Sequence, residues 1–146
     1  YNSDNGVGEL SMTNGDAKHD HWGLIYGGGM FVGISQDIII RNATSNQKSI
    51  DNLLRGLYKK YGGSNQSYSI EELIFEMSEL SGIDQTDFFK TYVFGTKKIP
   101  IEDYLTMAGL NAKIDQGSLK IFMNEKVNQD QKNLINGMFG KLNSNE

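Results

Sequence analysis

Apolar residues recur at the spacing of one helical face over much of this chain. The clearest example runs from Ile50 to Tyr61, where the apolar positions follow the i, i+3, i+4, i+7, i+8 pattern of an amphipathic helix. Ser49 precedes the run as an N-cap, and Gly62 and Gly63 end it. The residues on the predicted apolar face are Ile50, Leu53, Leu54, Leu57, Tyr58 and Tyr61.

A second amphipathic helix is predicted to begin after Ser69 and to end at Gly82. Ser69 and Glu72 have the spacing of a capping box, in which the serine hydroxyl and the glutamate carboxylate each accept a hydrogen bond from an otherwise unpaired amide. The apolar face of this helix consists of Ile70, Leu73, Ile74, Met77 and Leu80.

Two shorter helices are predicted next. Asp84 is the expected cap of the first, which ends at Gly95, and Pro100 precedes the second, which Gly109 closes. The first carries the aromatic cluster Phe88, Phe89, Tyr92 and Phe94, which we expect in the core, and the second carries Ile101, Tyr104, Leu105 and Ala108. The short connections between these helices are typical of a compact bundle.

The stretch from Gly29 to Arg41 is almost continuously apolar and predicts a helix that is buried on most sides. The β-branched run Ile38–Ile40 would also suit a strand, but the length of the stretch favours a helix. Gly29 and Gly33 lie four residues apart, so they would share one helical face and allow a neighbouring backbone to approach closely.

The two ends of the chain have a different character. Residues 1–21 are polar and glycine-rich without helical or strand periodicity, and we expect a mobile loop. Residues 118–123 alternate as in a short strand or extended segment, and residues 127–139 have the pattern of a last amphipathic helix. The polar tail after Lys141 is predicted to be disordered.

The expected fold class is therefore mainly α: a bundle of about five helices, then a short extended segment and a C-terminal helix. The organisation is a polar lead-in over residues 1–21, a helical domain over 22–110, and a strand, helix and tail over 111–146. A length of 146 residues suits a single domain. A hydrophobic fraction of 38% is low, so either a missing neighbour covers some apolar surface or some segments are loose.

Charge and composition exclude several classes of function. A net charge of -4 and an isoelectric point of about 5.2 give no electrostatic reason to bind nucleic acid. We find no apolar stretch near the length of a membrane span and no signal peptide, so no membrane partner is expected. The chain has no cysteine, which excludes disulfides and cysteine metal sites. It begins at Tyr1 without an initiator Met, as expected of a piece of a longer protein.

The residues offer few candidates for chemistry. His19 and His21 flank Asp20 and could contribute to a metal site, but two histidines are incomplete, so the pattern favours a solvated loop that Trp22 anchors on the bundle. Gly27–Gly29 before a helix is a weak signal for an anion cradle. There is no cysteine nucleophile, no serine-hydrolase elbow and no His-Glu-x-x-His.

Two acid–base pairs have the spacing of one helical turn. Asp37 and Arg41 lie four residues apart, as do Asp51 and Arg55. From spacing alone, each pair is expected to be an exposed salt bridge of a few tenths of a kcal/mol.

The order of motifs from Trp22 to Leu110 resembles the C-terminal helical domain of the glycyl aminopeptidase family of zinc metallopeptidases, whose catalytic core is thermolysin-like. The residues that carry the resemblance are Trp22–Gly29, Asp37–Arg41, Lys48–Arg55, Ser81–Asp84, Phe88–Gly95, Pro100 and Tyr104–Leu110. The match to the family's Asp-x-x-x-Arg spacing implies buried or interface roles for the two acid–base pairs.

The resemblance implies a catalytic role for Tyr26. In the family and its gluzincin relatives, a helix begins with Tyr-x-Lys-Gly, and the tyrosine hydroxyl stabilises the oxyanion formed when zinc-bound water attacks a peptide. Here the Tyr and the last Gly are present, whereas Gly28 stands at the Lys position. The family removes N-terminal residues, with a preference for glycine or alanine.

The implied zinc would belong to the complete parent enzyme, because its binding motif is absent from this chain. The implied partners are the catalytic domain of the parent chain and a peptide substrate, and the chain alone is not expected to be catalytic. Two alternatives stay open: a degenerate relative that keeps the bundle as a scaffold or interaction domain, and an unrelated helical binding module. An intact His-Glu-x-x-His upstream favours the enzyme, while the second alternative predicts no exposed apolar face near Tyr26.

Overall fold

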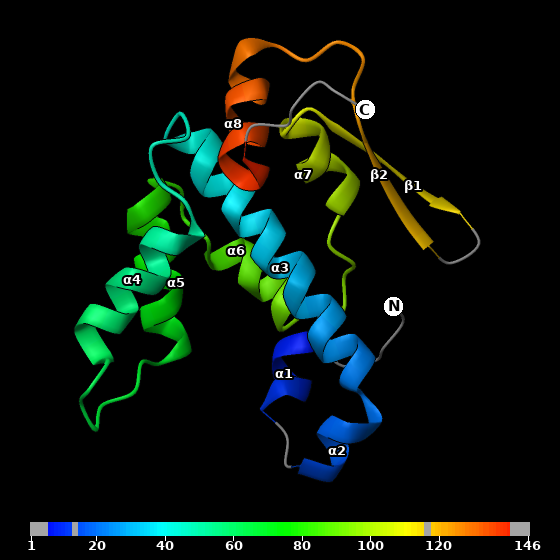
Figure 1. Cartoon of the computed structure of the whole chain (residues 1–146). Helices are drawn as coiled ribbons and strands as arrows, with labels where there is room; N and C mark the ends of the chain where they lie inside the picture. Colours follow the sequence, from blue (N-terminus) through cyan, green and yellow to red (C-terminus); the bar gives the residue numbers. More distant parts are fainter. Residues whose placement is uncertain (1–5, 13–14, 116–117, 141–146) are drawn as a thin grey trace.

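The computed structural model describes residues 6–12, 15–115 and 118–140, and it is mainly helical with one two-stranded sheet (Figure 1). The predicted fold class is confirmed. The elements are α1 (Val7–Ser11), α2 (Gly15–Asp20), α3 (Trp22–Ala43), α4 (Ile50–Tyr61), α5 (Ile70–Ser81), α6 (Thr86–Phe88) with a π-helical turn over Phe89–Val93, α7 (Ile101–Met107), β1 (Leu110–Asp115), β2 (Ser118–Met123) and α8 (Gln129–Phe139).

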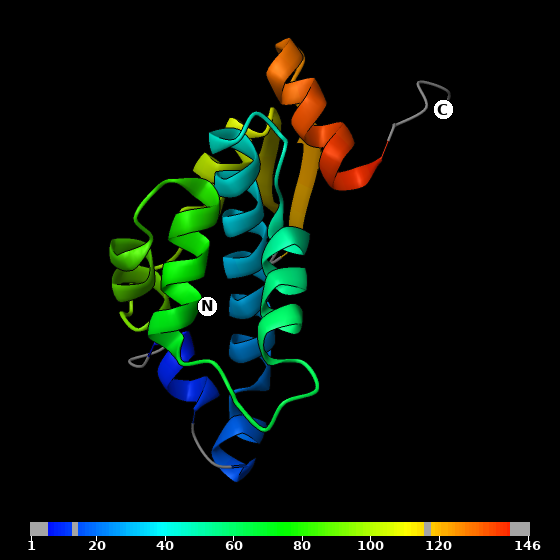
Figure 2. The same ribbon diagram turned by 90° about the vertical axis from the view of Figure 1, so that its left-hand side faces the viewer.

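The long helix α3 is the centre of the molecule. It contacts α1, α2, α4, α5, α7 and α8, and Figure 2 shows α4 and α5 on either side of it. The run Ile38–Ile40 is buried within this helix, which settles the choice between helix and strand. α3 begins at Trp22 and not near Gly29, so the predicted start was wrong. Gly27, Gly28 and Gly29 lie within the helix, and the residues on both sides of them are helical.

Length and composition alone would allow α3 to cross a membrane, since its 22 residues reach a mean hydropathy of 1.3 over the most apolar window. The expectation that no apolar stretch approaches the length of a membrane-spanning helix is therefore wrong by this criterion. The core helix of a globular bundle meets the same criterion, and among the described elements α3 packs against six other helices. Its central position fits a core helix.

The core has two parts, one on each side of α3. The first lies between α3, α4, α5 and the π-helical turn, and its buried members are Ile39, Leu53, Leu57, Met77, Phe88, Phe89, Val93 and Ile99. The second lies between α3, α7, β1 and α8, and its buried members are Ile38, Ile101, Leu105, Ala108, Leu110, Leu134 and Ile135. Ile38 and Ile39, which are adjacent in α3, thus belong to different core clusters.

The predicted helix caps of α4 and α5 are confirmed. The amide of Ser49 donates to Asn52 Oδ1 at 2.9 Å at the start of α4. At the start of α5, the amide of Ser69 donates to Glu72 Oε2 at 2.8 Å, and the amide of Glu72 donates to Ser69 Oγ at 3.2 Å. Gly82 ends α5 at a φ of 70°, a left-handed conformation that glycine adopts without steric cost.

The C-terminal part contains a strand that the sequence analysis missed. β1 pairs with β2 in antiparallel register, with Leu110 opposite Met123 and Ala112 opposite Ile121. A strand must pair its backbone groups with another segment, so the predicted strand at 118–123 required such a partner. α8 begins at Gln129 with Asn128 as its cap, close to the predicted helix. The tail predicted to be disordered after Lys141 lies outside the described residues.

The lead-in was predicted to be a mobile loop, and this is wrong for both of its described segments. Residues 7–11 form α1 and residues 15–20 form α2. Val7 and Leu10 of α1 are 5% and 3% exposed, since α1 packs against α3 and the π-helical turn. The isolated apolar residues of this segment are too widely separated to show a period, and burial against α3 determines the fold.

Candidate functional site

Tyr26 lies in the second turn of α3, not ahead of the helix as the sequence analysis expected. Its side chain is 66% exposed, so the phenol projects from the bundle and not into it. Tyr26 is therefore held on a helix, with much of its side chain open to solvent.

Three rings lie in a row across the junction of α2 and α3. The ring centroids of His19 and Trp22 are 5.6 Å apart, and those of Trp22 and Tyr26 are 5.3 Å apart. Trp22 is 52% exposed, so its contact with the preceding segment lies at the surface and not in the core. It connects His19 to Tyr26, and it forms part of an accessible aromatic surface.

A hollow of about 360 Å³ opens beside these rings. Its lining comes from three elements: Trp22, Ile25 and Tyr26 belong to α3, Lys18 and His19 to α2 together with Gly15, and Ser11 to α1. Among the described residues that line the hollow, Lys18 is the only one with a formal charge, counting histidine as neutral. The volume is in the range of small-ligand sites, which begin at about 300 Å³.

Gly28, which stands where the resemblance would place a lysine, has a structural partner in α1. A Cβ placed on Gly28 would lie 2.6 Å from Val7 Cγ2, so a side chain at this position would require Val7 to shift. Gly28 is buried, whereas a Cβ at Gly27 would meet nothing within 4 Å. Val7 of α1 thus occupies the space in which a side chain at residue 28 would begin.

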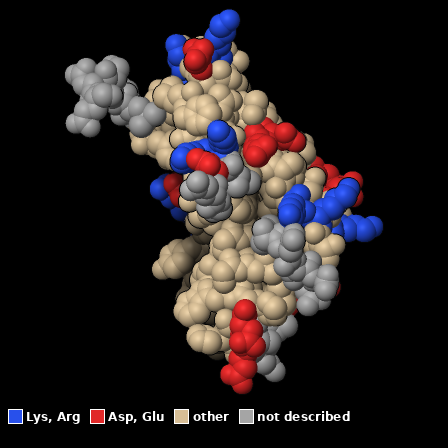
Figure 3. Space-filling view, turned by 90° about the vertical axis from the view of Figure 1, so that its right-hand side faces the viewer, with Lys and Arg blue, Asp and Glu red and all other residues tan. Residues whose placement is uncertain are grey.

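Charge is unevenly distributed on the face that Figure 3 presents. Acidic side chains gather at the lower end, where Figure 1 places α2, and uncharged side chains cover much of the surface above them. From Trp22 to Gln36, α3 carries no charged residue. Among the exposed residues of this stretch are Trp22, Tyr26 and Met30, which recur every four residues.

Asp37 and Arg41 form a largely buried ion pair, so the exposed salt bridge expected from spacing is wrong here. The Arg41 Nε to Asp37 Oδ2 distance is 2.8 Å, and the side chains are only 11% and 13% exposed. Asp37 Oδ1 also accepts a hydrogen bond from the amide of Ile50 at 2.9 Å, which fixes the start of α4 on α3. Asp51 and Arg55, by contrast, are exposed, and within the part of the chain that the structure describes they form no ion pair.

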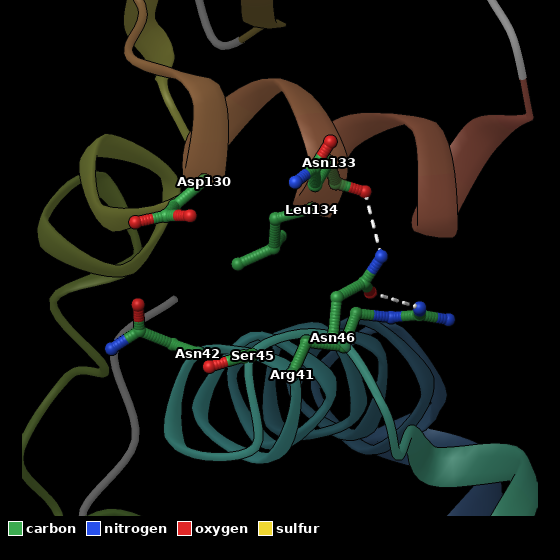
Figure 4. Close-up of a pocket in the computed structure, with 7 residues that line it drawn as sticks. All are labelled: Arg41, Asn42, Ser45, Asn46, Asp130, Asn133 and Leu134. Atoms are coloured by element: carbon green, nitrogen blue, oxygen red, sulfur yellow. Dashed lines mark hydrogen bonds between the residues drawn. The ribbon is translucent and has the colours of Figure 1, made fainter.

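The same network extends to α8 (Figure 4). Arg41 Nη1 donates to Asn46 Oδ1, and Asn46 Nδ2 donates to the carbonyl oxygen of Asn133, both at 2.7 Å. A cleft of about 80 Å³ lies between these side chains, Asp130 and Leu134. It is much smaller than the hollow beside Tyr26, and Arg41, Asn46 and Asn133 in its lining already bind one another. We assign this cleft a structural role.

The described residues, 6–12, 15–115 and 118–140, contain no group of three or more His, Cys, Asp or Glu side chains that could hold a metal ion. His19 packs against Trp22, and His21 occupies the residue before α3. Gly27–Gly29, the candidate anion cradle, lies inside α3, where its amides belong to the helix and do not face a ligand from a helix start.

Searches against protein-family models, curated proteins and solved structures gave no match to this chain. The functional assignment therefore depends on the residues and on their geometry.

Proposed function

We propose that this chain is the C-terminal helical domain of a glycyl-aminopeptidase-like zinc metallopeptidase, in which it forms one wall of the active-site cleft. The observation that carries the proposal is Tyr26, whose exposed phenol lines a hollow large enough for a substrate. The family's motif order from Trp22 to Leu110 supports the same role. The part of the chain that the structure describes provides no zinc ligand set, and the proposal therefore assigns the metal to another domain of the parent protein.

The chemistry assigned to Tyr26 is electrostatic. Zinc in such an enzyme supplies Lewis-acid activation of water and of the peptide carbonyl. The Tyr26 hydroxyl donates a hydrogen bond to the carbonyl oxygen as negative charge develops on it, and this stabilises the transition state. Such a donor must be held in place, and the ion pair of Asp37 with Arg41 and the buried run Ile38–Ile40 fix α3 in the bundle.

A second candidate function is a non-catalytic scaffold or interaction domain of a degenerate peptidase relative. The contact of Val7 with Gly28 favours it, because α1 takes the place of the family's lysine. Tyr26 would then be an inherited residue on a surface that binds a peptide or a neighbouring domain without cleaving it.

Peptidase assays of the parent protein and of the isolated chain distinguish the peptidase domain from the non-catalytic scaffold. The proposal predicts that the parent hydrolyses glycyl or alanyl chromogenic substrates, that a chelator abolishes turnover, and that the isolated chain shows none. A parent that binds no zinc and lacks turnover would favour the scaffold. Chelator-sensitive turnover that copurifies with the isolated chain would contradict the proposed division of roles.

A further inference from the structure

The hollow at the junction of α2 and α3 combines an apolar wall with one positive charge. Trp22 and Tyr26 form the wall with 52% and 66% of their surfaces exposed, so solvent now covers much of both rings. Ile25 adds aliphatic surface, and Lys18 contributes the ammonium. A ligand that covers the rings removes apolar surface from water, and a negative charge on it complements Lys18.

We infer that this hollow binds an apolar side chain whose adjacent carboxylate pairs with Lys18. The inference deepens the proposed function and rests on it for the natural ligand, which is the residue that follows the cleaved bond of a dipeptide. Tyr26 forms part of the same wall, so a dipeptide seated there lies against the residue to which the proposed function assigns the oxyanion contact. The substrate class is therefore dipeptides with an apolar C-terminal residue.

The two aspartates of α2 do not remove the preference for a ligand with a negative charge. Asp16 and Asp20 are exposed residues of the same helix, but they do not line the hollow. A ligand inside it meets the Lys18 ammonium and the aromatic rings. Exposed ion pairs contribute little, so the apolar contact supplies most of the affinity and Lys18 the preference for an acid.

Trp22 gives a direct readout, because it is the only tryptophan of the chain and lies in the wall. We would titrate the chain with glycyl-leucine and with glycyl-leucinamide, which lacks the carboxylate, and follow Trp22 emission together with the amide resonances of Lys18 and Tyr26. We expect saturable binding of glycyl-leucine in the millimolar range, about 1–10 mM. Glycyl-leucinamide is expected to bind about 2–5-fold more weakly.

The substitution Lys18→Gln is expected to remove the difference between acid and amide, while Lys126→Gln, at an exposed position of the loop before α8, preserves it. Circular dichroism of both variants checks that the fold is unchanged. The inference is overturned if neither the Trp22 emission nor the amide resonances change saturably up to about 50 mM glycyl-leucine. The dissociation constant would then lie well above the expected millimolar range. The inference is also overturned if the acid and the amide bind the unmodified chain equally.

The result is independent of turnover in the parent protein. If the chain binds glycyl-leucine at this hollow but the parent has no peptidase activity, the binding site is supported and the proposed function is rejected. If turnover by the parent depends on Tyr26 but the chain does not bind the dipeptide, the proposed function is supported and the binding site is rejected.

Discussion

Gly27 and Gly28 are adjacent in α3 but have opposite surroundings. A Cβ at Gly27 meets nothing within 4 Å, whereas a Cβ at Gly28 would lie 2.6 Å from Val7. In a helix interior, glycine is less favourable than alanine by about 0.8–1 kcal/mol because of its backbone freedom. Sequence alone gives the two residues the same helical preference, and only the position of α1 distinguishes them.

We therefore predict opposite signs for two alanine substitutions. Gly27→Ala is expected to stabilise the chain by about 0.5–1 kcal/mol. Gly28→Ala is expected to destabilise it by about 1–3 kcal/mol, because the added methyl group displaces α1. Urea denaturation measures both, and hydrogen exchange in Val7–Ser11 should rise only for Gly28→Ala. Stabilisation by both substitutions would show that α1 does not pack on Gly28.

A second prediction concerns two aspartates with the same spacing to an arginine. Asp37→Ala leaves the largely buried guanidinium of Arg41 without its carboxylate and the amide of Ile50 without its acceptor. We expect it to cost about 3 kcal/mol of unfolding free energy. The control Asp51→Ala, at an exposed position, is expected to change it by less than about 0.5 kcal/mol. Chemical denaturation tests this, and equal losses would contradict a structural role specific to Asp37.

At the scale of elements, the segments that the sequence predicted well carry their own start and stop signals. Ser49, Ser69 and Gly82 act locally, so α4 and α5 were placed almost to the residue. The segments it predicted wrongly depend on distant partners. α1 is helical because Val7 and Leu10 bury themselves against other elements, and β1 exists because β2 pairs with it. Neither condition is visible in a local pattern.

The capping box of α5 gives a prediction about acid sensitivity. The amide of Ser69 and then the Tyr61 hydroxyl, whose bond to Glu72 Oε1 is 2.7 Å long, hold the pKa of Glu72 below its ordinary value of 4.5. A carboxyl whose pKa is lower in the folded chain stabilises the fold above the unfolded pKa. This contribution is lost as the pH falls from about 4.5 through the folded pKa.

Replacement of Glu72 by Gln should therefore make the melting temperature of the chain less dependent on pH below about 4.5. Glu71→Gln is the matched control, because Glu71 is exposed and adjacent in the first turn of α5. Thermal unfolding followed between neutral and acid pH provides the comparison. An identical acid response of the Glu72→Gln variant and the unmodified chain would show that the capping carboxylate does not contribute.

At the scale of the whole molecule, the candidate site was only partly visible in the sequence. His19, Trp22 and Tyr26 were each singled out, but their alignment requires that α2 is a helix and that α3 begins at Trp22. The hollow, with Lys18 and Ile25 in its lining, could not be predicted, since three separate elements contribute to it. The link from Asn46 to Asn133 was equally hidden, because these residues are 87 positions apart.

The central claim is that Tyr26 acts on a substrate while the bundle holds it in place. Tyr26→Phe removes the hydroxyl from an exposed ring, so the isolated chain should keep its melting temperature. Tyr58→Phe provides a matched control, because Tyr58 is 78% exposed on α4 and lies outside the lining of the hollow.

The most direct measurement is the kcat of the parent protein on a glycyl substrate, with Tyr26→Phe compared to Tyr58→Phe. Loss of one oxyanion donor predicts that Tyr26→Phe lowers kcat by about 10²–10³-fold and changes KM far less. Tyr58→Phe is predicted to leave both constants unchanged. A Tyr26→Phe enzyme with full kcat would contradict the account.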